Sequence, residues 1–166
     1  MAAIETAATP NRHVLTLVRR ALLEHEGIRS RIRRIEDAMA SMHRCPEQAM
    51  AIGLRREAMS LLAETGVHAN WEERTLVPAL AEAGRDRGGP DVACTAWMLE
   101  TNHTLAAELL DGFLNATKSV ALSFDDVVWA SAALPLRQAC ALMKEQVELE
   151  EALLFDPALY AEGDCE

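Results

Sequence analysis

The chain has 166 residues and a mass of 18.2 kDa, which is enough for one domain with a substantial core and too little for two. Its formal net charge of −10 argues against nucleic acid as a main partner, because phosphate binding requires a basic face. No apolar run reaches the about 18 residues that span a bilayer and residues 1–10 do not resemble a signal peptide, so we expect a cytoplasmic protein with no membrane partner.

The composition favours helices along the whole chain. Ala and Leu are abundant, the chain has only 8 Gly and 6 Pro, and strand-favouring aromatic and β-branched runs are scarce. A first helix is expected from about Asn11 to the Cys45-Pro46 step, because Pro suits the first turn of a following helix. Apolar residues recur along this helix at steps of three and four, and His25 lies within that stripe.

A second helix is expected to run to about Ala83, with Pro78 as a kink or a break in its last turn. The stretch over residues 84–90 is rich in Gly and predicts a turn. Asp91 can cap a third helix, whose apolar stripe contains a single polar member, His103.

The third helix should end near Val120, and the Ser and Asp residues within 123–126 signal the start of a fourth. Pro135 must bend the fourth helix or delay its regular part, and Pro157 should end it near Phe155.

Four amphipathic helices with short connections predict an all-α fold, an antiparallel up-down-up-down four-helix bundle. We place this domain at residues 11–159. A flexible N-terminus over residues 1–10 should precede it, and an acidic tail over residues 160–166 should follow it.

Two similar motifs carry polar residues into the inner stripes. His68 and Glu72 stand four residues apart, so on a helix they project from one face roughly 6 Å apart. Gln146 and Glu150 repeat this pair late in the chain, with a doubled Glu and a Pro-x-Leu ending in both copies. The second Glu of each doublet lies about 100° from that stripe, so we expect it to face solvent or to brace the inner residues from outside.

An antiparallel bundle would bring the inner polar residues to one level. They are His25, His68, Glu72, His103, Gln146 and Glu150. Burying an unpaired carboxylate costs several kcal/mol, against a net domain stability of about 5 to 15 kcal/mol. A bound metal would compensate this cost, and imidazole with carboxylate is a fitting ligand set for iron, manganese or zinc.

These stretches resemble the hemerythrin-like proteins with HHE-type cation-binding domains. The resemblance spans about residues 11–159, and the order and helical phasing of the motifs make it specific. The motifs are LLEHEGIR around His25, HANWEE and VPAL from His68 onward, ETNHTL around His103, and QVELEE and LLF from Gln146 onward.

The resemblance implies a hemerythrin-like bundle that holds an oxo- or hydroxo-bridged di-iron centre. Such a centre binds oxygen or responds to oxygen, nitric oxide or redox state. On this mapping His25 and His68 serve one iron and His103 serves the other, while Glu72 and Glu150 bridge the two.

Two positions depart from the family pattern. Gln146 stands where the pattern has a histidine, and Ala107 stands where the oxygen carriers have a second histidine one turn after His103. An amide oxygen is a weaker ligand than imidazole for a divalent transition metal. Three outcomes are therefore open: two metals with Gln146 or water filling in, one metal between the first two histidines and Glu72, or a vestigial site kept for its fold.

We therefore expect a protein that binds non-heme iron, with a role in oxygen, nitric oxide or redox sensing, oxygen binding or iron handling, and catalysis is not required. A metal-free helical regulatory or interaction domain is one alternative. A ferritin-like di-iron oxidase is another, although the chain has His-x-x-x-Glu and no Glu-x-x-His at inner positions. The sequence identifies no protein partner and leaves a homodimer open.

Overall fold

The structure, a computed structural model, describes residues 12–44, 47–84, 92–119 and 125–155, and none of these residues lies in a strand. The helical elements are α1 (Arg12–Arg44), α2 (Gln48–Trp71), η1 (Glu72–Leu76), α3 (Val77–Gly84), α4 (Val92–Ala116), α5 (Asp126–Glu150) and η2 (Glu151–Phe155). Here η1 and η2 are π-helical turns. Because α2, η1 and α3 follow one another without a break, as do α5 and η2, the described residues form four long helices, as the sequence predicts.

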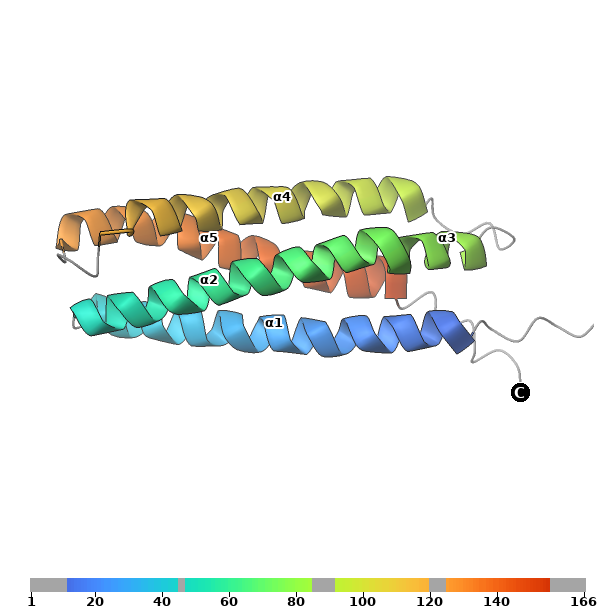
Figure 1. The fold of residues 1–166 in the computed structure, drawn as a ribbon, viewed down its shortest axis with the longest axis horizontal. Helices are drawn as coiled ribbons and strands as arrows, with labels where there is room; N and C mark the ends of the chain where they lie inside the picture. The colour runs from blue at the N-terminus through green and yellow to red at the C-terminus, as the bar shows by residue number, and fades with distance from the viewer. Residues whose placement is uncertain (1–11, 45–46, 85–91, 120–124, 156–166) are drawn as a thin grey trace, which may run out of the picture.

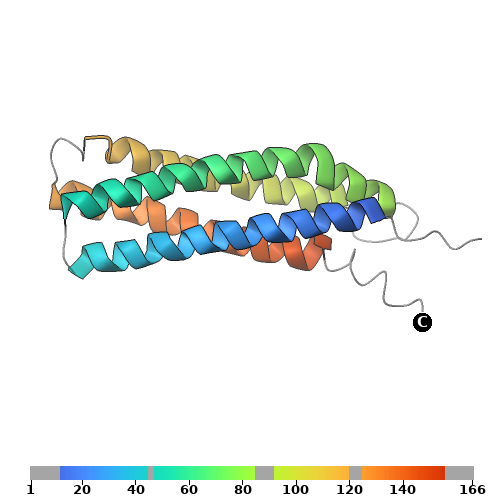
Figure 2. The same ribbon diagram turned by 60° about the horizontal axis from the view of Figure 1, so that its bottom comes forward.

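The long helices lie side by side in an arrangement compatible with a four-helix bundle (Figure 1). Helix α1 packs against α2 and α5, and α4 packs against the same two helices. Figure 2 shows the same neighbours from another side. None of the described helices has the length and apolar character that crossing a membrane requires.

Several sequence-based predictions concern residues outside the described ones. They are the helix starts and stops at Asn11, Cys45, Pro46, Asp91, Ser123 and Pro157, most of the turn over residues 84–90, and the terminal segments 1–10 and 160–166.

At Pro78, where a kink or a break in the last turn is expected, the helix does not break, and a π-helical turn precedes the proline. The N–H of Val77 bonds to the carbonyl of Glu72, five residues earlier, and the helix then continues through Pro78 as α3. Proline lacks an N–H and collides with the carbonyl four residues before it in an α-helix. The wider π turn that precedes Pro78 reduces this collision. The helix is therefore continuous, and Glu72 is the first residue of the π turn.

The last two helices differ from expectation at two points. Helix α4 ends at Ala116, before Val120, where Arg55 of α2 donates to the carbonyl of Leu114 and to Thr117 Oγ1. Helix α5 is regular from Asp126 onward and continues through Pro135, so the proline does not delay the start of the regular helix.

The side chain of Asp125 caps α5. Its Oδ1 accepts hydrogen bonds from the backbone N–H groups of Val127 (2.8 Å) and Val128 (3.1 Å). These bonds satisfy two of the donors that a helix start leaves open. Of the start signals in the sequence, Asp125 is the one that acts as the cap.

The apolar core has two parts, with a polar layer between them. The larger cluster includes Ile32, Leu61 and Leu110, and the smaller one includes Val18 and Phe155. The layer between them consists of buried polar side chains, which are His25, His68, Glu72, Gln146 and Glu150. A polar layer inside a helical core requires a compensating partner.

Candidate metal centre

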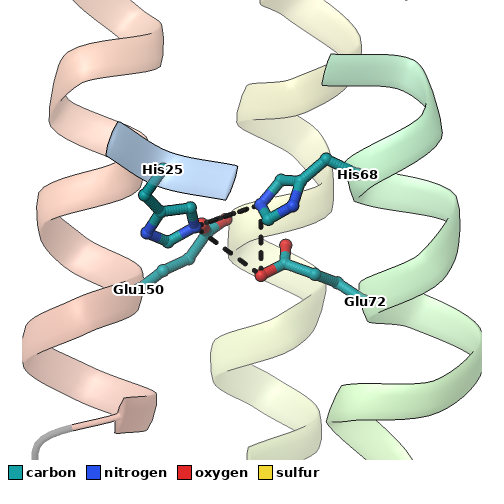
Figure 3. A group of neighbouring side chains, drawn as sticks. All are labelled: His25, His68, Glu72 and Glu150. Atoms are coloured by element: carbon teal, nitrogen blue, oxygen red, sulfur yellow. Dashed lines mark hydrogen bonds and ion pairs between the residues drawn. The ribbon is translucent and has the colours of Figure 1, made fainter. Parts of the chain in front are cut away.

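Four buried side chains point at one place within the polar layer (Figure 3). They come from different elements: His25 from α1, His68 from α2, Glu72 from η1, and Glu150 from the last residue of α5. One ligand atom from each lies within 4.8 Å of the others. All four side chains are at least about nine-tenths buried, with relative exposures of 0%, 2%, 6% and 1%.

The separations of these atoms suit a metal ion. The Nε2 atoms of His25 and His68 are 3.0 Å apart, and each lies near one carboxylate: His25 Nε2 is 3.1 Å from Glu150 Oε2, and His68 Nε2 is 3.3 Å from Glu72 Oε1. The two remaining imidazole–carboxylate separations are both 3.9 Å. Ligand bonds of about 2.1 Å place the corners of a tetrahedron about 3.4 Å apart, within the span of these values.

An outer carboxylate orients His68. Its Nδ1 donates to Glu24 Oε2 at 2.8 Å, and Arg20 Nε donates to Glu24 Oε1 at 2.7 Å. Burial raises the pKa of Glu24, but its hydrogen bonds from His68 and Arg20 outweigh burial and lower it. With the proton fixed on Nδ1, the His68 Nε2 lone pair faces the centre.

A second outer carboxylate does the same for His25. Its Nδ1 donates to Glu151 Oε1 at 2.9 Å, and Arg29 donates to both oxygens of Glu151 at 2.8 Å. Glu151 therefore braces a candidate ligand from outside, one of the two roles expected for it, whereas Glu73, its counterpart, is exposed. His25 and His68 thus each stand in an arginine–carboxylate–imidazole chain, the usual support of a metal-bound histidine.

Without a metal, the layer holds protons that a cation would displace. Both Nδ1 atoms already donate outward, so a proton must lie between the two facing Nε2 atoms to prevent lone-pair repulsion. Burial lowers the pKa of His68, but Glu150, Glu72 and Glu24 raise it overall to about 9. Burial and the charge of Glu150 raise the pKa of Glu72 to about 8.

Glu150 is the most strongly acidic member of the group. Burial raises its pKa, but the facing imidazoles of His25 and His68 lower it overall to about 2. Three oxygens of the layer are buried with no hydrogen-bond partner in the described part of the chain: Glu72 Oε1, Glu150 Oε2 and Gln146 Oε1. Glu72 Oε1 and Glu150 Oε2 are also the oxygens that face the imidazoles. Buried oxygens without a donor are expected where a cation binds, because the cation takes the place of the donor.

His103 and Gln146, the other two predicted ligands, approach the opposite oxygen of Glu150. His103 Nε2 lies 3.5 Å from Glu150 Oε1, and Gln146 Nε2 donates a hydrogen bond to the same oxygen. Burial lowers the pKa of His103. Half-buried His103 therefore lies beside the five buried residues of the layer, and four of these six predicted residues form the close group.

The two halves of the layer are related by a constant shift in sequence. His103 follows His25 by 78 positions (103 − 25), Gln146 follows His68 by the same number (146 − 68), and Glu150 follows Glu72 likewise (150 − 72). The core obeys the same shift, since buried Ile32 matches buried Leu110 (110 − 32). Two of the three pairs have the same residue type in both halves, and the third has an amide, Gln146, in place of the imidazole of His68.

Aromatic rings close the centre. The ring of Phe155 stacks on His25, with centroids 5.3 Å apart, and Trp71 lies 6.3 Å from His68. The guanidinium of Arg20 lies 4.0 Å from the centre of the Trp71 ring. Trp71 therefore lies where it can shield the site from water.

Sequence reasoning did not assign Arg20, Glu24 or Arg29 to the site. Helical periodicity places them off the inner stripe. Glu24 and Arg29 join the site through contacts between helices, and Arg20 binds Glu24 within α1. The spacing of Arg20 and Glu24, four residues apart beside a candidate ligand, is the one local signal of this arrangement.

The arrangement can hold a divalent transition metal. Within the described parts of the chain, the close group is the one cluster of His, Cys, Asp and Glu side chains with the spacing of a metal site. The site offers two imidazoles and two carboxylates, all buried, and an outer carboxylate holds each imidazole. This ligand set fits iron, manganese and zinc. No family model, no curated protein and no solved structure matches this chain.

Proposed function

We propose that this protein is a hemerythrin-like non-heme iron protein that binds or senses oxygen, nitric oxide or redox state, or handles iron. The iron would lie between His25, His68, Glu72 and Glu150. One observation carries this proposal: two imidazole nitrogens and two carboxylate oxygens converge in a buried layer, and each imidazole is oriented by an outer carboxylate. An antiparallel up-down-up-down bundle is part of the proposal, and the course of the colours along the helices in Figure 1 supports it.

Iron is favoured within the proposal by the ligand set. Imidazole and carboxylate suit iron, manganese and zinc alike, but a site with two histidines, carboxylates and open coordination positions is typical of non-heme iron. When bound, iron would supply a redox-active centre with room for a small ligand. The protein's own residues orient the imidazoles, hold the carboxylates and exclude water.

The first test is metal content and its link to stability. A metal that binds only the folded chain raises the melting temperature, so chelation should lower it. We expect iron in protein purified without added metal, measured by elemental analysis and by the ultraviolet-visible spectrum. His68→Ala should abolish both the metal and the effect of the chelator, whereas His43→Ala, at an exposed histidine near the end of α1, should change neither.

The same experiment separates the alternatives. Equal melting temperatures with and without stoichiometric iron would favour a metal-free regulatory or interaction domain. Rapid, repeated oxidation of excess ferrous iron would favour a ferritin-like oxidase. Glu100, the residue of α4 that forms Glu-x-x-His with His103, is exposed and does not enter the layer, which speaks against the oxidase.

A further inference from the structure

We infer that the centre holds a single ion, that Gln146 keeps a second ion out, and that His103 donates a hydrogen bond to a small anion on the ion's open side. This inference rests on the proposed function and deepens it. It gives His103 and Gln146 roles other than binding a metal.

The ligands available to a second ion are too few. The 78-position shift assigns it His103, Gln146 and Glu150, in place of the two imidazoles and the carboxylate of the first half. Helix α4 offers no further ligand one turn later, because that position is Ala107. A second ion would therefore have one imidazole, whereas the close group supplies two imidazoles and two carboxylates to the first.

The Gln146 amide already occupies the oxygen that a second ion would need. Its Nε2 donates to Glu150 Oε1, while Glu150 Oε2 faces His25. This bond is buried, since Gln146 is 2% exposed and Glu150 is 1% exposed. A second ion at Oε1 would have to break the bond without gaining an imidazole in exchange, so the amide fixes Glu150 as a ligand of one ion.

His103 lies beside the close group without belonging to it. Its ring is perpendicular to that of His68, with centroids 6.3 Å apart. Its Nε2 is 3.5 Å from Glu150 Oε1, longer than a good hydrogen bond, so its N–H makes at most a weak hydrogen bond to that oxygen. An anion of two or three atoms bound on the ion could accept this N–H.

Charge favours an anion as the ligand. Glu72 and Glu150 together neutralise a divalent ion, so a ferric ion in the same place leaves one positive charge in a dry layer. A monovalent anion restores neutrality, and His103 can stabilise it further through a charge-assisted hydrogen bond.

Iron stoichiometry and azide binding to the ferric protein test this inference. We expect one iron per chain in the wild type and in His103→Leu, with an azide dissociation constant about tenfold higher in the variant, the loss of one such hydrogen bond. His103→Gln, which keeps an N–H donor, should recover part of the affinity. His43→Leu is the matched control, and circular dichroism confirms that each variant is folded.

Gln146 is tested in the same assay. Gln146→Leu should still hold one iron, whereas Gln146→His, which supplies the missing imidazole, should raise the content toward two per chain. Two irons in the wild type, falling to one in His103→Leu, would overturn the inference by making His103 a ligand. Equal azide affinities in wild type and His103→Leu would also overturn it. A wild type that binds no iron would refute the proposed function itself.

Discussion

At the scale of single residues, the outer carboxylates decide how well the centre binds metal. Glu24 and Glu151 each accept the Nδ1–H of a candidate ligand and are each held by an arginine. Losing such a partner typically weakens metal binding 10- to 100-fold, because the imidazole can then rotate or change tautomer.

The first prediction therefore concerns Glu151→Gln and Glu24→Gln. Each should weaken metal affinity by about 10- to 100-fold, and Glu151→Gln should have the larger effect because Arg29 binds both of its oxygens. Glu73→Gln, at the exposed neighbour of Glu72, is the control. Competition with a chelator of known affinity measures all three, and equal affinities in all would show that the outer carboxylates do not support the ligands.

The second prediction concerns the pH dependence of the metal-free protein. Folding raises the pKa of Glu72 from 4.5 to about 8 and that of His68 from 6.5 to about 9, so the folded chain binds protons more tightly than the unfolded one. The free energy of unfolding contributed by these groups is fully present at low pH. It is lost from pH 4.5 to about 8 for Glu72 and from pH 6.5 to about 9 for His68.

The melting temperature in excess chelator should therefore fall most steeply between about pH 6.5 and 8, where both groups lose their contribution, and should go on falling to about pH 9. Glu150 does not contribute in this window, because its lowered pKa leaves it ionised in both states. Metal binding requires deprotonated ligands, so the stabilisation by metal should grow as pH rises through the same window. Parallel pH profiles with and without metal would contradict this coupling.

The sequence identified the inner residues but not their grouping. The three- and four-residue spacing places His25, His68 and Glu150 on buried stripes, and all three are buried. Periodicity along one helix carries no information about which oxygen of Glu150 faces which neighbour. The division of the layer into a close group of four and the pair His103 and Gln146 depends on packing between helices, which only the structure gives.

At the scale of elements, helix starts and ends were predictable where a local signal exists. The Asp cap of α5 follows from the ability of an Asp side chain to accept from the free N–H groups of a helix start. The π turns were not predicted, because one extra residue in a turn leaves the apolar pattern on either side almost unchanged. Both lie at ligand positions, since η1 begins with Glu72 and η2 directly follows Glu150.

The third prediction concerns the Asp125 cap. Asp125→Ala should lower the free energy of unfolding by about 1 kcal/mol, a fall of about 2 to 4 °C in melting temperature, because two N–H groups lose their acceptor. Asp125→Asn keeps an oxygen acceptor and should cost less. Metal affinity should not change, because Glu150 lies at the other end of α5, and a large loss of metal in Asp125→Ala would contradict this separation.

At the scale of the whole molecule, the polar layer divides the core. The smaller cluster, with Val18, Leu80 and Phe155, lies on one side of the layer, and the larger cluster, with Ile32 and Leu110, lies on the other. Apolar contact is therefore interrupted at the layer. The two ends of the molecule should open independently when no metal is bound, since the apolar core is not continuous between them.

Hydrogen exchange can test whether the two ends open independently. At the site end, around Val18 and Leu80, opening breaks the ligand set, so a metal concentration about 100 times the dissociation constant should slow exchange by up to about 100-fold. At the far end, around Met42 and Ala51, local openings leave the four ligands in place, and metal should not slow exchange there. His68→Ala should abolish the difference between the metal-free and metal-treated profiles. If metal slows exchange equally at both ends, the molecule opens only as a whole, and the polar layer does not divide it.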